Sequence, residues 1–125
     1  MKLSVLVIEG DATVARFLVK VCSQQGWQAD APRTGPQVAG ALLSDTHYDL
    51  ITVSYKFPGT NGADIITLIR ELDPRKGTPV LMITGDPAVT VEALAAGATE
   101  ILYKPIEPHK LADAIIRLTA LRIAS

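Results

Sequence analysis

The sequence predicts an α/β fold in which helices cover both faces of a parallel sheet. Short runs of branched and apolar residues alternate along the chain with longer stretches of helical period, a pattern that is typical of such sheets. Two of the apolar runs, Leu3 to Ile8 and Leu50 to Val53, lack the apolar–polar alternation of a half-exposed strand, which indicates buried central strands. The length of 125 residues suits one domain, and we expect residues 1–125 to form it.

Five apolar runs have the length and composition of strands. They cover Leu3 to Ile8, Gln28 to Ala31, Leu50 to Val53, Val80 to Thr84 and Glu100 to Tyr103. Because helical stretches connect them, right-handed crossovers give a doubly wound five-stranded sheet with flavodoxin-like strand order in a three-layer α/β/α arrangement. In such sheets the functional site lies at the carboxyl ends of the strands.

Five helices are expected from apolar periodicity and from end signals. They cover Ala12 to Gln25, Pro36 to Ser44, the segment after Asn61 through Leu72, Pro87 to Ala96 and Pro108 to Arg122. Gly26 can adopt the left-handed conformation that ends the first helix. Asn61 is a typical N-cap, and Asp86 with Pro87 forms a cap and first-turn pair for the fourth helix.

Polar residues follow four of the expected strands where these strands end. They are Glu9, Gly10, Asp11, Ser54, Lys56, Thr84 and Lys104, in which the glycine interrupts an otherwise polar set. Carboxylates at such a position can hold Mg²⁺, while a hydroxyl and a lysine can hold phosphoryl oxygens. The sequence therefore predicts a pocket of the phosphate-binding type at this edge of the sheet.

Several short motifs in a fixed order carry a family resemblance. They are Val5 to Ile8, Gly26-Trp27, Pro58 to Gly62, Pro79 to Thr84, Gly97-Ala98 and Lys104-Pro105. Each motif alone is weak, but together they cover essentially the whole chain, which resembles the CheY-like receiver domains of two-component response regulators. The resemblance implies an α/β fold of the same type and a role in phosphorelay signal transduction.

The resemblance assigns family positions to individual residues of this chain. Ser54 stands at the position of the aspartate that takes the phosphoryl group, so the chain resembles a degenerate pseudo-receiver. Thr84 corresponds to the switch hydroxyl and Lys104 to the phosphate-contacting lysine. Glu9 and Gly10 occupy the two acidic positions after the first strand. Ile101 stands where the family often has a switch tyrosine or phenylalanine.

These differences predict a pocket without catalytic or metal-ligating residues. Mg²⁺ requires several oxygen ligands, so we expect the metal site to be lost or very weak and no other cofactor to bind. We expect Asp11 to cap the first helix and Lys56 to be an exposed loop lysine. A partly buried Lys104 needs a partner, which predicts that it pairs with Glu9 or Asp11 and fills the space left by metal and phosphate.

The predicted function is that of an atypical receiver, not an enzyme, that acts as a protein-interaction module independently of aspartyl phosphorylation and Mg²⁺. Two alternatives stay open at this stage. One is a receiver that still accepts a phosphoryl group at a non-standard residue. The other is a sensor of a small anion or other ligand that uses the degenerate pocket.

Charge and composition limit the classes of molecule that this domain is expected to bind. The net charge is −1 and no run of lysine or arginine occurs, so we expect no binding of nucleic acid or of membranes by this domain. The one cysteine, Cys22, has no disulfide partner, and no signal peptide follows Met1, which predicts a cytoplasmic protein. Expected partners are a histidine kinase or an effector, and a second copy bound through the fourth helix, fifth strand and last helix.

Overall fold

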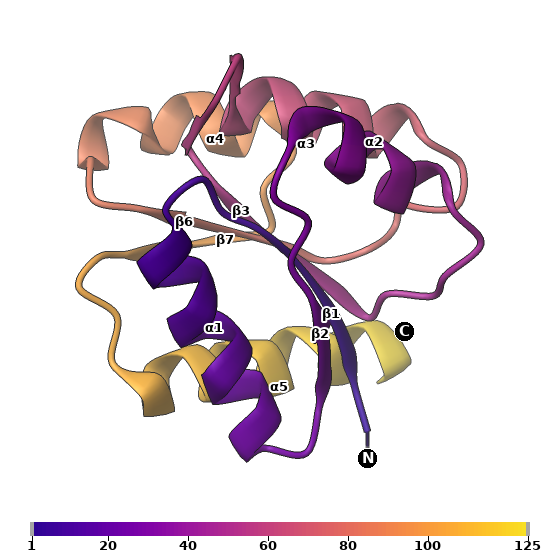
Figure 1. Cartoon of the computed structure of the whole chain (residues 1–125), viewed down its shortest axis with the longest axis vertical. Helices are drawn as coiled ribbons and strands as arrows, with labels where there is room; N and C mark the ends of the chain where they lie inside the picture. Colours follow the sequence, from indigo (N-terminus) through magenta and orange to yellow (C-terminus); the bar gives the residue numbers. More distant parts are fainter. Residues whose placement is uncertain (1, 125) are drawn as a thin grey trace.

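The structure is a computed structural model that describes residues 2–124, with side-chain surroundings for residues 2–120. A parallel sheet of five strands has the order β2-β1-β3-β6-β7. Helices α1 and α5 cover one face of the sheet, and α2, α3 and α4 cover the other (Figure 1). The predicted three-layer α/β/α fold is therefore confirmed.

The elements of the main fold lie close to their predicted bounds. The sheet strands are β1 (Ser4–Ile8), β2 (Gln28–Asp30), β3 (Leu50–Ser54), β6 (Val80–Thr84) and β7 (Glu100–Tyr103). The helices are α1 (Ala12–Gln24), α2 (Gly35–Leu43), α3 (Gly62–Glu71), α4 (Thr90–Ala96) and α5 (Pro108–Ala124). Among the described residues, no helix is long and apolar enough to cross a membrane.

The core has two halves, one on each side of the sheet. Every residue of β3 and β6 is buried, because both faces of these central strands are covered. Successive side chains of a strand point to opposite faces. Ile51 and Val53 accordingly pack in the half beneath α2, α3 and α4, whereas Leu50 packs in the half with α1 and α5. Cys22 and Trp27 are both buried and pack in the half of the core that contains α1 and α5.

Hydrogen bonds at the helix starts agree with the predicted caps, with one correction. The Asn61 side chain accepts from the Asp64 N–H at the start of α3. Asp86 accepts from the Ala88 N–H, but the residues that follow form a 3₁₀ turn, η1 (Pro87–Val89), and α4 begins only at Thr90. The prediction of one helix from Pro87 was thus wrong in its first turn.

A short hairpin at the end of β3 was not predicted. Strands β4 (Lys56–Phe57) and β5 (Thr60–Asn61) pair antiparallel, and Gly59 in the turn between them has a φ of +82°, a conformation that favours glycine. Each strand has only two residues, too few for a periodic signal in the sequence. The hairpin positions the loop that borders the candidate site.

A buried arginine joins the chain after α3 to the end of α2. The Arg75 guanidinium donates to the carbonyl oxygens of Ala41 and Leu42 in the last turns of α2, at 3.1 and 3.0 Å. It also donates to the carbonyl of Ser44 at 2.8 Å, and it lies over the Tyr48 ring, 5.0 Å from its centroid. The last carbonyls of a helix lack the N–H donors of a following turn; the Ser44 hydroxyl also donates to the Ala41 carbonyl, at 2.7 Å, and Arg75 closes the rest of the end of α2.

We expect Arg75→Met to lower the free energy of unfolding by about 3 kcal/mol, because several buried carbonyl groups lose their donor at once. Urea denaturation monitored by circular dichroism measures this loss. The matched control is Arg117→Met, which removes a partly exposed pair with Glu100 and should cost much less, because solvent screens such pairs. Equal losses in the two variants would contradict the role given to Arg75.

We expect Thr52→Val to raise the free energy of unfolding by about 1 kcal/mol, because the variant removes a buried hydroxyl that lacks a hydrogen-bond partner. Thr52 is 2% exposed, and its Oγ1 bonds to none of the described residues. Thr119→Val is the control, since the equally buried Thr119 hydroxyl donates to the Ile115 carbonyl at 2.7 Å. A gain from Thr119→Val that equals the gain from Thr52→Val would refute this reasoning.

Candidate functional site

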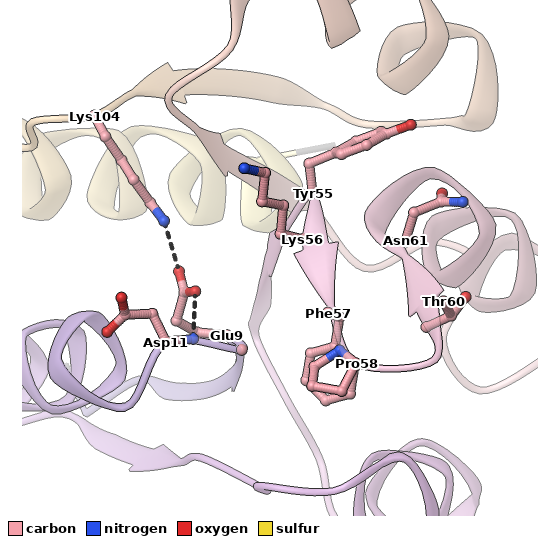
Figure 2. Close-up of a pocket in the computed structure, with 10 residues that line it drawn as sticks. Glu9, Asp11, Tyr55, Lys56, Phe57, Pro58, Thr60, Asn61 and Lys104 are labelled. Carbon is pink, nitrogen blue, oxygen red and sulfur yellow. Dashed lines mark hydrogen bonds and ion pairs between the residues drawn. The ribbon is translucent and has the colours of Figure 1, made fainter.

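The carboxyl ends of β1 and β3 and the segment after β7 border one open pocket of about 600 Å³. Figure 2 shows Glu9, Asp11 and Lys104 on one side of it and the hairpin from Lys56 to Asn61 on the other. Of the predicted site residues, Glu9, Gly10, Asp11, Lys56 and Lys104 line this pocket. Thr84 lines an adjoining pocket that Lys56 and Lys104 also border.

Glu9 and Lys104 form the predicted ion pair. The Lys104 ammonium lies 3.4 Å from Glu9 Oε1, and the second carboxylate oxygen accepts from the Asp11 N–H at 3.0 Å (Figure 2). The Glu9 side chain is only 3% exposed, so its charge requires this partner. The pair does not fill the space as predicted, because the open pocket remains beside it.

Asp11 caps α1, as predicted. Its Oδ1 accepts from the N–H groups of Thr13 and Val14 at 2.8 and 3.1 Å. These two backbone hydrogen bonds, with smaller contributions from the positive charges of Lys104 and Arg16, lower the pKa of Asp11. The carboxylate is therefore engaged by the helix and is not paired with Lys104.

The Ser54 hydroxyl is held between two backbone segments. It donates to the Lys56 carbonyl at 2.8 Å and accepts a long hydrogen bond, 3.5 Å, from the Gly10 N–H. Ser54 is 2% exposed. The hydroxyl thus ties the β1–α1 loop to the hairpin, and its proton is already donated.

Gly10 is required by the packing of the hairpin. A Cβ atom at this position would lie 2.9 Å from the Lys56 carbonyl oxygen and 3.2 Å from Pro58 Cδ. Real Cβ atoms do not approach backbone oxygens so closely without a shift of the neighbour. A carboxylate at position 10 would therefore require the hairpin to move away from the β1–α1 loop.

Thr84 and Ile101, the two positions that the resemblance assigns to switching, have different surroundings. Thr84 is buried, and its Oγ1 accepts from the Asp86 N–H at 3.1 Å. Ile101 packs against the core half that contains α4 and does not line the pocket. Lys56 is exposed, as expected.

Tyr55 is a site residue that the sequence reasoning missed. Its hydroxyl donates to the Glu92 carboxylate of α4, with 3.1 Å to each oxygen. This hydrogen bond is the main reason why the pKa of Tyr55 is raised. Its position next to Ser54 was the only available signal, because the contact with Glu92 joins residues 37 positions apart.

The arrangement of this site at the strand ends agrees with comparisons of the whole chain. Residues 5–116 match the family described as response regulator receiver domain. The chain belongs to this family. Receiver domains act in two-component signalling, where they interact with histidine kinases and effectors.

Known proteins similar to this receiver differ in length. It is 29% identical to the transcriptional regulatory protein ResD of Bacillus subtilis over 94% of the chain but 47% of ResD. It is 37% identical to the sensor kinase/phosphatase LuxQ of Vibrio harveyi over 91% of the chain but 13% of LuxQ. It is 25% identical to the chemotaxis protein CheY of Thermotoga maritima over 92% of the chain and 96% of CheY. The receiver thus spans about half of ResD and nearly all of CheY.

Solved structures have the same fold. The receiver domain of a signal transduction histidine kinase from Syntrophus aciditrophicus is 28% identical with a TM-score of 0.83, and the match covers 94% of this chain and 90% of that one. The chemotaxis response regulator CheY4 of Vibrio cholerae has a TM-score of 0.84 at 23% identity and covers 94% of this chain and 99% of its own. The second likeness supports the fold alone.

We expect Gly10→Ala to lower the free energy of unfolding of this receiver by about 1–3 kcal/mol, because the added methyl group overlaps the hairpin backbone. Gly40→Ala in α2 is the matched control. Its added methyl meets nothing within 4 Å, and alanine is the better helix former, so that variant should gain about 0.5–1 kcal/mol. Chemical denaturation of both variants tests this. Gains of similar size in both would show that the hairpin does not pack on Gly10.

Proposed function

We propose that this receiver is a pseudo-receiver, a protein-interaction module of two-component signalling that works without aspartyl phosphorylation and without Mg²⁺. The observation that carries the proposal is Ser54. At the end of β3 this chain has a hydroxyl whose proton is donated to the Lys56 carbonyl at 2.8 Å. On this proposal the domain is not an enzyme, because it neither takes up nor hydrolyses a phosphoryl group.

The surroundings of Ser54 argue against its use as a substitute acceptor. Serine is a weak nucleophile unless a neighbouring base takes its proton. Among the described residues, Ser54 Oγ has only backbone partners. Neither histidine lines the pocket. His47 instead contacts Asp49, and His109 contacts Glu107. The nearby carboxylate of Glu9 already has partners in Lys104 and the Asp11 N–H.

The residues present do not fit the Mg²⁺ ion that the family implies. This small cation requires near-octahedral oxygen coordination. The Glu9 carboxylate is already paired with Lys104, 3.4 Å from its Oε1, and the Asp11 carboxylate caps α1. Gly10 has no side chain and no room for one. No group of three His, Cys, Asp or Glu residues that could hold a metal ion occurs in the described part of the chain.

The signal would then pass through binding of partners. We propose a histidine kinase or an effector, because proteins named as a sensor kinase and as a transcriptional regulator contain a similar domain. A second copy could bind through α4, β7 and α5. Val91, Leu94 and Tyr103 support this part of the proposal, since they are 79%, 50% and 44% exposed and lie on α4 and β7. We propose no binding of nucleic acid or membranes by this domain.

We expect intact-mass spectrometry to detect no phosphoryl adduct after incubation of the wild-type chain with acetyl phosphate and Mg²⁺, because the acceptor and the metal ligands are missing. A receiver with an acceptor aspartate serves as positive control in the same reaction. Ser54→Asp and Gly10→Asp/Ser54→Asp variants, incubated alongside, report how much of the remaining machinery can work once carboxylates return.

The outcome that overturns the proposal is a stoichiometric adduct on the wild-type chain. Hydroxylamine then separates the two routes, since it cleaves an acyl phosphate on a carboxylate and leaves a serine ester intact. An adduct that survives hydroxylamine and disappears in Ser54→Ala would establish the alternative of a non-standard acceptor. A rise of the melting temperature with phosphate alone would favour the alternative of an anion sensor.

A further inference from the structure

A second groove lies between α1 and the segment that follows β2. It has a volume of about 530 Å³. Its floor consists of the small apolar side chains of Ala12, Ala15 and Val19 on α1 and of Ala31 after β2. Ala15 is buried, Val19 and Ala31 are half-buried, and Ala12 is exposed. The groove is separate from the pocket around Glu9, with which it shares no lining residue.

Three cations border this groove. Arg16, Lys20 and Arg33 all line it and are all exposed. None of the three forms an ion pair with any described residue. Among residues 2–120, Arg16 donates only to the Thr13 hydroxyl, at 3.4 Å, and Arg33 donates to the Glu9 carbonyl at 3.2 Å. No carboxylate of the described residues lines the groove.

This concentration of positive charge is a local departure from the rest of the chain. The whole chain has a net charge of −1, and Asp11, the carboxylate that feels the charge of Arg16, is engaged in capping α1. Arg16 and Lys20 stand four positions apart on one helix face, an arrangement in which like charges repel. Carboxylates from another molecule would remove this repulsion.

We propose that the groove docks an acidic segment of a partner protein, whose carboxylates pair with Arg16, Lys20 and Arg33 while small apolar side chains fill the floor. The combination of three cations with an apolar surface of alanine and valine favours a peptide over a nucleic acid, because a phosphate backbone has no apolar group to pack on that surface. Three cations around a concave floor also offer little to a lipid surface. The proposal rests on the interaction role proposed above and specifies the chemistry of a partner.

The test uses a defined probe and the full chain. A ¹⁵N-labelled sample is titrated with an acetylated peptide of repeated Glu-Leu-Ala-Glu units, and the amide shifts are followed by NMR. We expect saturable shifts confined to α1 and to residues 31–33. A peptide with Gln in place of Glu should lose this binding, because the rim charges then have no partner.

A pair of charge-matched variants separates the groove from the overall charge. Arg16→Gln/Lys20→Gln should weaken peptide binding about tenfold, as expected for the loss of two ion pairs. Lys2→Gln/Lys110→Gln removes two exposed cations outside the groove and should leave the affinity unchanged. Arg33 is kept in both because it also contacts the Glu9 carbonyl.

Several results would overturn the proposal. They are the absence of shifts at millimolar peptide, equal loss in both variants, or tighter groove binding by a DNA oligonucleotide or by phosphatidylserine vesicles. A dimer in sedimentation that Arg16→Gln/Lys20→Gln dissociates would assign the groove to a second copy instead. The phosphorylation experiment above is independent, since a phosphoryl adduct with intact peptide binding would refute the proposed function alone, and the converse result would refute only the docking site.

Discussion

The pairing of β1 with β3 is the constraint on which the candidate site depends. Val7 lies opposite Thr52 and Ile8 opposite Val53 in this parallel ladder, so the residues that follow the two strands must meet at one edge of the sheet. Glu9, Gly10 and Ser54 are neighbours for this reason alone. Because the side chains of a strand alternate between faces, a shift of one residue would turn Ile51 and Val53 away from their half of the core. The buried strands thus fix the site far more firmly than any contact within it.

The site balances the buried charge of Glu9 with an ion pair, although Glu9 Oε1 has no hydrogen-bond partner among the described residues. A lysine near a buried carboxylate is stable only as a pair, and Lys104 supplies the positive charge that a metal ion would otherwise bring to Glu9. The hydroxyl of Ser54 and the bare backbone of Gly10 let the hairpin approach the β1–α1 loop. Positions 10 and 54 are therefore coupled in space. The Ser54 hydroxyl donates to the Lys56 carbonyl oxygen at 2.8 Å, and a Cβ atom at Gly10 would lie 2.9 Å from the same oxygen.

Features that depend on apolar periodicity and on signals at the ends of helices were predictable from the sequence. The five sheet strands, the Asn61 cap and the role of Asp11 follow from residues close together in the chain. A pairing of Lys104 with Glu9 or Asp11 was predictable because the fold places both strand ends at one edge and a half-buried ammonium needs a partner; the structure shows that the partner is Glu9. The hairpin from Lys56 to Asn61, the guanidinium of Arg75 and the contact of Tyr55 with Glu92 were not predictable. These depend on exact side-chain geometry between distant segments, for which composition carries no signal.

A ligand shifts a protein between two conformations only if it binds them with different affinity. The structure contains one link between the groove beside α1 and the pocket. Arg33 lines the groove and also donates to the Glu9 carbonyl at 3.2 Å, and the same Glu9 holds Lys104. A carboxylate that bound Arg33 would compete with the Glu9 carbonyl for the guanidinium and would thereby act on the β1–α1 loop. On the two proposals made above, the route from partner to pocket would run through backbone hydrogen bonds and an ion pair and would need no phosphoryl group at Ser54.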